Sequence, residues 1–445
     1  MKTIYRQLFF AAILTVLLGA GSHSVMAQDA CDAATAAYAE WTALFEKKDL
    51  ASRKLAVEKG KEFVTKYGSC EPTKDGGIFI KDSLPGMEAV IKRIEERNYE
   101  NALLKRFDDG MKAKNWDDVY ASGKEVVSKY VDIDVNSAAD TPEVQKQKKD
   151  RADKYRAAKL VLGSIGLDET GKSPSVTKWN EDTIRYAKSS IADIEAGKTF
   201  AAWGVAPFVY KGKDDALGWM NYTIGYILFN DRKDKKGAAD YMYKASQIAS
   251  DTKTNPVVYS SIASFYVLDL NKNIEELKAL PAPVDADTPE VKQQKVDAIK
   301  DKTGMVNGAA ERVMDAYARA FKFAPMTPAS KAYRDSLKAS FKQIYDIRFQ
   351  KPDATTPTVD TWIDMAAAKP IVNPSTPITP VLDAEKASTT TATPGPGTPV
   401  TVKPSTPSGT APVKPAGPAA KPTPAGAKPA GAKPAVAAVK KKAAR

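Results

Sequence analysis

Two segments of the chain match each other, and this internal repeat limits the possible folds more than any other sequence feature. Residues 59–67 read Lys-Gly-Lys-Glu-Phe-Val-Thr-Lys-Tyr, and residues 122–130 read Ser-Gly-Lys-Glu-Val-Val-Ser-Lys-Tyr. Each is preceded by a segment in helical period, around Trp41 and Phe107, and by a short Lys/Asp/Asn turn. Each copy is therefore predicted to be an antiparallel pair of helices built from one template.

Helical hairpins of this kind cannot bury both faces alone, so neighbouring hairpins must stack. A second duplication, Ala-Asp-Thr-Pro-Glu-Val at 139–144 and 286–291, marks two helix starts. Threonine suits the N-cap, proline the first helical position, and glutamate the positive helix end. Strand signals are nearly absent. We expect an all-α fold of roughly 12–15 stacked helices, with Gly76-Gly77 and Leu84-Pro85-Gly86 among the helix breakers.

Residues 216–256 carry the features of a known repeat family. The first helix reads Asn221-x-x-Ile224-Gly225-x-x-Leu228, the second reads Ala239-x-x-x-Tyr243-x-Ala245-Ser246, and Asn255-Pro256 opens the next. This pattern resembles the tetratricopeptide repeat, and residues 316–325 resemble the end of another unit. The first two hairpins lie 63 residues apart instead of about 34, so the repeats are degenerate. The resemblance implies an α-solenoid of antiparallel hairpins, coiled into a right-handed superhelix with a concave binding face.

The first residues have the three parts of a secretory signal. Lys2 and Arg6 precede an apolar run at 8–18, and Val25-Met26-Ala27 provides a cleavage site. The run is too short for a comfortable membrane span. We expect residues 1–27 to be removed, leaving an exported chain without a transmembrane segment in the periplasm or cell envelope of a bacterium. An uncleaved anchor is the alternative.

Export places the two cysteines, Cys31 and Cys70, in an oxidising compartment. They bracket the first predicted hairpin, whose two helices of about 15 residues return the chain to its starting end. A disulfide between them is expected, with two free thiols as the alternative.

The net charge of +12 is unevenly distributed. The signal contributes +2 and the residues from 371 onward +8, which leaves only +2 on the predicted helical-repeat domain at 28–370. A nucleic-acid partner is therefore not expected. Residues 371–445 are rich in Pro, Ala, Thr and Lys, and they are predicted to form a disordered basic tail. Its last cations, Lys440, Lys441, Lys442 and Arg445, could hold anionic cell-wall or lipopolysaccharide polymer; a solubilising linker is the alternative.

The sequence offers little catalytic chemistry. Its single histidine, His23, lies in the signal, so the mature chain lacks histidine-dependent nucleophiles and the common zinc sites. Gly304-x-x-x-Gly308 lacks the Lys-Ser/Thr of a phosphate-binding loop. The acidic loops at 132–136 and 231–234 are interpreted as solvated acids and not as calcium sites. We expect no enzyme activity, cofactor or metal, although a carbohydrate-active helical enzyme using paired carboxylates stays possible by composition.

The densest run of aromatic residues lies between 200 and 229. Its candidate binding residues are Trp203, Tyr210, Trp219, Tyr222 and Tyr226. They are either repeat core or a ligand surface, with Trp203 and Tyr210 in a loop expected to line a groove. The sequence thus predicts an exported, non-catalytic scaffold that binds a protein or peptide. The alternative is a structural envelope protein anchored by its tail.

Overall fold

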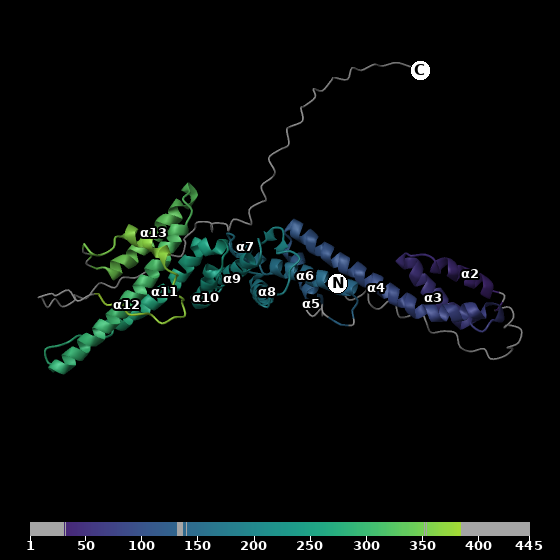
Figure 1. Ribbon diagram of the computed structural model, residues 1–445, viewed down its shortest axis with the longest axis horizontal. Helices are drawn as coiled ribbons and strands as arrows, with labels where there is room; N and C mark the ends of the chain where they lie inside the picture. Colours follow the sequence, from purple (N-terminus) through teal and green to yellow (C-terminus); the bar gives the residue numbers. More distant parts are fainter. Residues whose placement is uncertain are drawn as a thin grey trace, which may run out of the picture. The chain divides into compact units, whose positions relative to one another are not determined.

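The structure is a computed structural model, and it describes residues 31, 33–130, 137–138, 140–350, 352 and 354–383. The regular secondary structure of these residues is helical apart from one short β-hairpin, so the predicted all-α class is confirmed (Figure 1). The predicted signal at 1–27 and the tail residues Lys440, Lys441, Lys442 and Arg445 lie outside the described residues.

The chain divides into two compact units between Arg106 and Phe107, inside helix α4. The first unit contains α2 (Ala34–Phe45), α3 (Leu50–Tyr67), the 3-10 turn η1 (Glu71–Thr73) and most of α4 (Lys74–Ala113). The second begins with the end of α4 and continues with α5 (Trp116–Tyr130), α6 (Pro142–Leu162), α7 (Ile165–Thr170), α8 (Asn180–Glu195), β1 (Gly204–Val205), β2 (Phe208–Val209), α9 (Lys213–Asn230), α10 (Lys235–Gln247), η2 (Asp251–Thr254), α11 (Pro256–Lys278), α12 (Pro289–Phe323), η3 (Pro328–Ser330), α13 (Lys331–Arg348), α14 (Val359–Met365) and η4 (Ala366–Ala368).

The first unit is built on the predicted hairpin of α2 and α3. Its core contains Trp41, Phe63 and Ile80, all almost fully buried. The disulfide between Cys31 and Cys70 is present, with the two Cα atoms 5.5 Å apart, so that prediction is confirmed. The bond ties the start of α2 to the turn before α4, where the hairpin returns.

The glycine breakers predicted at 76–77, and Pro85, lie instead inside α4, a helix of 40 residues. At Gly76 the reason is packing: a Cβ there would lie 2.6 Å from the ring of Tyr38. The glycine therefore serves a close approach of α2 to α4 and does not end the helix.

The internal repeat of the sequence is also a repeat of packing. Gly60 in α3 and Gly123 in α5 each face the aromatic residue of the preceding helix. A Cβ at Gly60 would lie 2.9 Å from Trp41 Nε1, and one at Gly123 would lie 3.0 Å from Phe107 Cε2. In both copies a leucine side chain of a further helix also closes on the glycine. In both hairpins, therefore, a glycine leaves room for the aromatic ring of the preceding helix.

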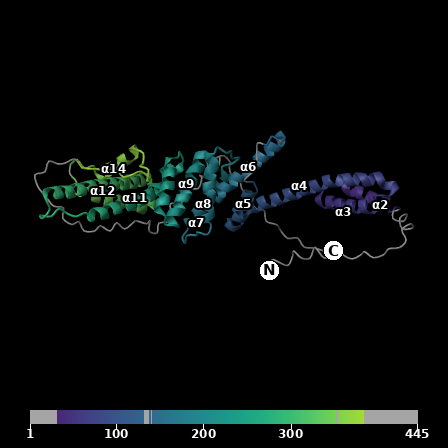
Figure 2. The same ribbon diagram turned by 90° about the horizontal axis from the view of Figure 1, so that it is seen from below.

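In the second unit each helix packs on its neighbours in the sequence, from α5 and α6 through α8, α9, α10, α11 and α12 to α13. Figure 1 shows α9 and α10 side by side, and Figure 2 shows the same for α11 and α12. Residues 216–249 thus form a helix pair, and the pair packs closely at Gly225, where a Cβ would lie 3.0 Å from Met242 Cγ.

The duplicated helix starts behave as predicted. Thr141 and Thr288 each accept a hydrogen bond from the backbone N–H three residues later, and a proline occupies the first position of α6 and of α12. Asn255 caps α11 in the same way, ahead of Pro256. These caps fix where the helices of the second unit begin.

The described part of the chain continues beyond the predicted boundary between 370 and 371, as far as residue 383. Residues 371–383, here called the strap, run without helix or strand structure against α12. Ile371 at its start is 5 % exposed and belongs to the core of the second unit.

Candidate functional sites

The predicted aromatic loop forms a tight antiparallel hairpin of β1 and β2. Gly204 adopts φ +99°, and a Cβ there would lie 2.0 Å from the carbonyl oxygen of Phe208, so only glycine fits. The backbone N–H of Tyr210 donates to the carbonyl oxygen of Trp203 at 2.8 Å. The two loop residues expected to line a groove are thus joined by the hairpin itself.

The five aromatic candidates do not form one surface. Tyr222 and Tyr226 are 1 % and 8 % exposed in the core, and partly buried Trp219 packs against the same cluster. Trp203 and Tyr210 are partly buried against a different core cluster, formed largely by α8 and α9. Of the two alternatives, repeat core and ligand surface, burial supports core for Tyr222 and Tyr226, which face the protein interior.

The polar ends of the loop aromatics are also engaged. The hydroxyls of Tyr210 and Ser164 lie 2.5 Å apart, and burial raises the pKa of Tyr210, which keeps its proton available for this bond. Trp203 stacks on Phe200 with ring centroids 4.6 Å apart. These contacts indicate that the loop aromatics hold the hairpin on the helices.

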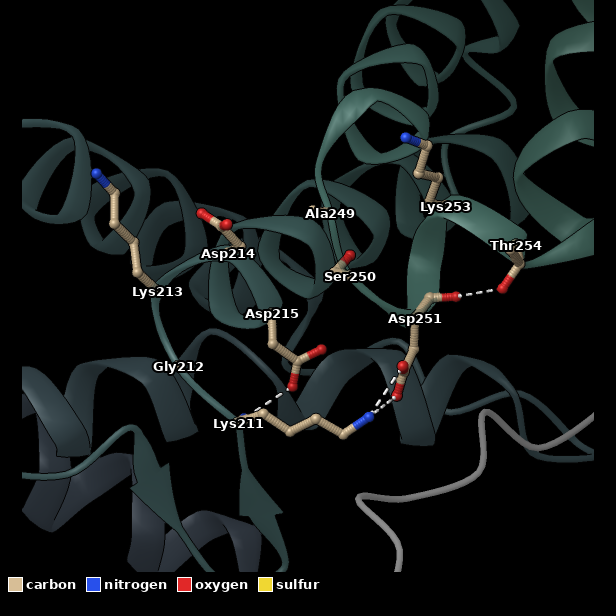
Figure 3. Close-up of a pocket in the computed structure, with 10 residues that line it drawn as sticks. All are labelled: Lys211, Gly212, Lys213, Asp214, Asp215, Ala249, Ser250, Asp251, Lys253 and Thr254. Carbon is tan, nitrogen blue, oxygen red and sulfur yellow. Dashed lines mark hydrogen bonds and ion pairs between the residues drawn. The ribbon is translucent and has the colours of Figure 1, made fainter.

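A pocket of about 600 Å³ lies directly after this hairpin, at the start of α9 (Figure 3). It is lined by Lys211, Gly212, Lys213, Asp214, Asp215, Ala249, Ser250, Asp251, Lys253 and Thr254. Lysines and aspartates are equal in number in this lining, so the pocket has no net formal charge to select an anion or a cation.

Two of the charged side chains that line this pocket, Lys211 and Asp251, form an ion pair. Lys211 Nζ contacts both carboxylate oxygens of Asp251 at 2.9 and 2.7 Å, and this hydrogen bond raises the pKa of Lys211. Asp215, 7 % exposed, accepts from the backbone N–H of Lys211 at 2.9 Å. Its other oxygen has no hydrogen-bond partner. Asp215 stands in the first turn of α9, where the positive helix end favours a carboxylate. Its position is therefore that of a structural cap.

The strap crosses α12 at two glycines one helical turn apart. A Cβ at Gly308 would lie 2.0 Å from the carbonyl oxygen of Thr379, so the strap backbone rests directly on the helix. A Cβ at Gly304 would meet side-chain atoms and no backbone, with Leu382 Cδ2 at 2.9 Å and Pro380 Cβ at 3.3 Å. We call the surface formed by Tyr266, Gly304, Asn307, Gly308 and Arg312 the strap groove.

The groove holds the strap mainly through its main chain. Carbonyl oxygens of the strap accept hydrogen bonds at Val372, Thr376, Pro377 and Val381. The donors are the Tyr266 hydroxyl, the Arg312 guanidinium, which reaches two neighbouring carbonyls, and the Asn307 amide. The N–H of Val381 donates in turn to the carbonyl oxygen of Gly304 at 2.9 Å. Burial raises the pKa of Tyr266, so its hydroxyl stays a donor.

Few strap side chains take part. Ile371 and Pro374 are buried, and Ile378 packs against the core, whereas most other strap residues are exposed. The far end is fixed by ion pairs: Asp383 lies 2.7 Å from Arg348 Nη2, and Arg348 Nε also contacts Glu311 at 2.9 Å. The strap is therefore held through its extended backbone and through apolar side chains at three spaced positions.

The comparisons with known proteins provide no family: no family model, no curated protein and no solved structure matches this chain. Within the described residues, no cluster of three or more His, Cys, Asp or Glu side chains could hold a metal ion. Every helix in that part of the chain also falls short of the combined length and apolar character needed to cross a membrane.

Sequence reasoning missed the strap groove. Two signals were present: the pair Gly304-x-x-x-Gly308 on one face of a helix, and three apolar positions in an otherwise proline- and threonine-rich segment. In the sequence, this glycine pair resembles part of a phosphate-binding loop, and nothing local shows that another segment lies against it.

Proposed function

We propose that the protein is an exported, non-catalytic helical-repeat scaffold of the tetratricopeptide type that binds a protein or peptide partner in extended form. The observation that carries this proposal is the strap, an extended segment held on the surface of α12 through its main-chain carbonyls. In β-strand addition, extended peptides are bound in the same way, with affinity from main-chain hydrogen bonds and specificity from pockets for spaced side chains.

Other observations support parts of the proposal. The consecutive packing of α8 to α13, with a close approach at Gly225, agrees with stacked hairpins, to which the resemblance adds a right-handed superhelix. The absence of histidine after residue 23 supports a non-catalytic role. The Cys31–Cys70 disulfide supports export, because disulfides persist in oxidising compartments.

A displayed library of random twelve-residue peptides tests the proposal. The bait is the full chain with Ile378→Asp and Val400→Asp, which weaken the strap and the similar segment at 396–401 so that the groove is accessible. Selected peptides should carry apolar residues at the spacing of Ile371, Pro374 and Ile378. Adding Arg312→Leu should abolish the selection, because it removes the donors to two neighbouring carbonyls.

Arg185→Leu is the matched control, because Arg185 is an exposed arginine that contacts its near neighbours Asp182 and Tyr186 and lies far in sequence from the groove. Selection should survive this change. The same peptides recovered on the Arg312→Leu bait, or none on any bait, would contradict the proposed function.

A further inference from the structure

The hexapeptide of the strap that crosses the groove recurs later in the chain. Residues 374–379 read Pro-Ser-Thr-Pro-Ile-Thr, and residues 396–401 read Pro-Gly-Thr-Pro-Val-Thr. Four of the six positions are identical, and Ile378 is replaced by Val400, which has the same branched apolar character. The shared pattern is Pro-x-Thr-Pro-(Ile/Val)-Thr.

The shared positions are the ones that the groove contacts. Pro374 is buried and Ile378 packs on the core. Thr376 and Pro377 present the two carbonyls that accept from Arg312, and Thr379 rests on Gly308. The one position that changes without similarity is Ser375, which is exposed and donates from its hydroxyl to Asp240 Oδ1 at 3.0 Å; Gly397 cannot make this bond. The second copy therefore keeps the contact residues of this segment apart from the one that reaches Asp240.

Resting on the proposed peptide-binding function, we infer that the strap groove is a binding site for the motif Pro-x-Thr-Pro-(Ile/Val)-Thr. Residues 396–401 of the same chain are its second ligand, and they enter the groove when residues 374–379 leave it. The chain thus carries two interchangeable ligands for one site.

Chain length favours this exchange within one molecule. Residues 370–395 would form the connecting loop, whose root-mean-square span is roughly 28 Å for a flexible chain. The gap to be bridged, from Lys369 to the place of Pro374, is roughly 15 Å for extended chain. The longer loop makes closure roughly tenfold less favourable than for the strap, which explains why the strap is the resident ligand. A tethered segment also has an effective concentration in the millimolar range, above that of a second copy at micromolar protein.

Fluorescence anisotropy with two labelled peptides tests the inference on full-length protein. One peptide spans residues 394–403 and the other spans strap residues 372–381. The unchanged chain should bind both weakly, because its own strap fills the groove. The single variant Ile378→Asp should remain weak, because residues 396–401 take the vacated place. The double variant Ile378→Asp/Val400→Asp should bind both peptides more tightly by about tenfold or more, since the groove is then free.

Two glycine substitutions in the double variant locate the binding. Gly308→Ala should abolish binding of both peptides, because its Cβ would collide with a backbone carbonyl. Gly304→Ala is the matched control on the same helix, since its Cβ meets side-chain atoms of Leu382 and Pro380 and no strap backbone, and peptide 394–403 should still bind. Far-UV circular dichroism verifies that each variant keeps its helices. In the otherwise unchanged chain, Gly308→Ala should also speed hydrogen exchange of the Val381 amide, which donates to Gly304 when the strap is bound. This rate measures how fully the strap occupies the groove and needs no added peptide.

Three results would overturn the inference. The first is equal peptide binding by Ile378→Asp and by the double variant, which would mean that residues 396–401 do not occupy the groove. The second is binding of peptide 372–381 but not of peptide 394–403, which would leave the proposed function standing and remove only the second ligand. The third is a concentration-dependent doubling of mass in the Ile378→Asp variant, which would place the second ligand on another copy. Failure of both peptides would instead contradict the proposed function.

Discussion

The disulfide of the first unit should control the stability of its helical hairpin. Cys31 and Cys70 are 39 residues apart, so the bond removes loop entropy from the unfolded unit worth about 4 kcal/mol. Whole domains are stable by about 5–15 kcal/mol, and this loss would therefore leave α2 and α3 only marginally stable. Replacing both cysteines by alanine removes the bond without leaving a reactive thiol.

Amide hydrogen exchange followed by mass spectrometry measures this loss locally. Backbone amides of α3 that exchange only on unfolding of the unit should exchange roughly a thousandfold faster in the double alanine variant, the factor that corresponds to 4 kcal/mol. Reducing the unchanged protein with dithiothreitol should give a similar increase with every side-chain atom retained. Peptides from α9 and α11, in the second unit, serve as the internal control and should be unchanged.

Either of two results would refute this reasoning. An increase below about tenfold in α3 would mean that the hairpin is held by its Trp41 core and not by chain connectivity. An equal increase in α9 and α11 would mean that the two units do not unfold separately.

Three shorter predictions concern other features. Gly60→Ala should lower the melting temperature through overpacking worth about 1–3 kcal/mol, whereas Gly86→Ala, where a Cβ meets nothing within 4 Å, should raise it slightly. Burial alone would raise the pKa of Asp193, but hydrogen bonds from Lys159 and another lysine hold that pKa below its usual value. Urea titrations should therefore show stability that is complete above about pH 4 and lost as the pH falls through the lowered pKa, with a weaker loss for the Lys159→Met/Asp193→Leu variant. N-terminal sequencing of chain exported from a bacterial host should begin at Gln28, and retention of residue 1 would rule out the signal.

Local signals in the sequence were sufficient for much of the fold. Helix caps such as Thr141 and Thr288 act within a few residues of themselves, so their effect can be predicted without tertiary structure. The disulfide could be predicted because a helical hairpin returns the chain to its starting end, which brings Cys31 to Cys70. The repeated hairpins were recognisable because the same glycine and aromatic residues recur in both copies.

The remaining features depend on tertiary contacts, which local sequence patterns do not show. From the sequence, Gly76 is predicted to break a helix. In the structure α4 continues through it, because the ring of Tyr38 occupies the space that a side chain at residue 76 would need. The sequence left core and ligand surface both open for Tyr222 and Tyr226, and the helices that pack on α9 bury them. The strap groove was not predicted, because its main contacts are to backbone carbonyls, which every residue type carries.

The strap also has a mechanical consequence. A pull on the chain beyond residue 383 reaches the body first at the ion pair of Asp383 with Arg348, then at Val381, and only afterwards at the carbonyls that Arg312 holds. Because these contacts are loaded one after another, we expect them to open in sequence. Release of residues 371–383 would yield roughly 40 Å of extended chain before the force reaches α14. A pull on the chain would therefore lengthen this segment before it loads the helices of the second unit.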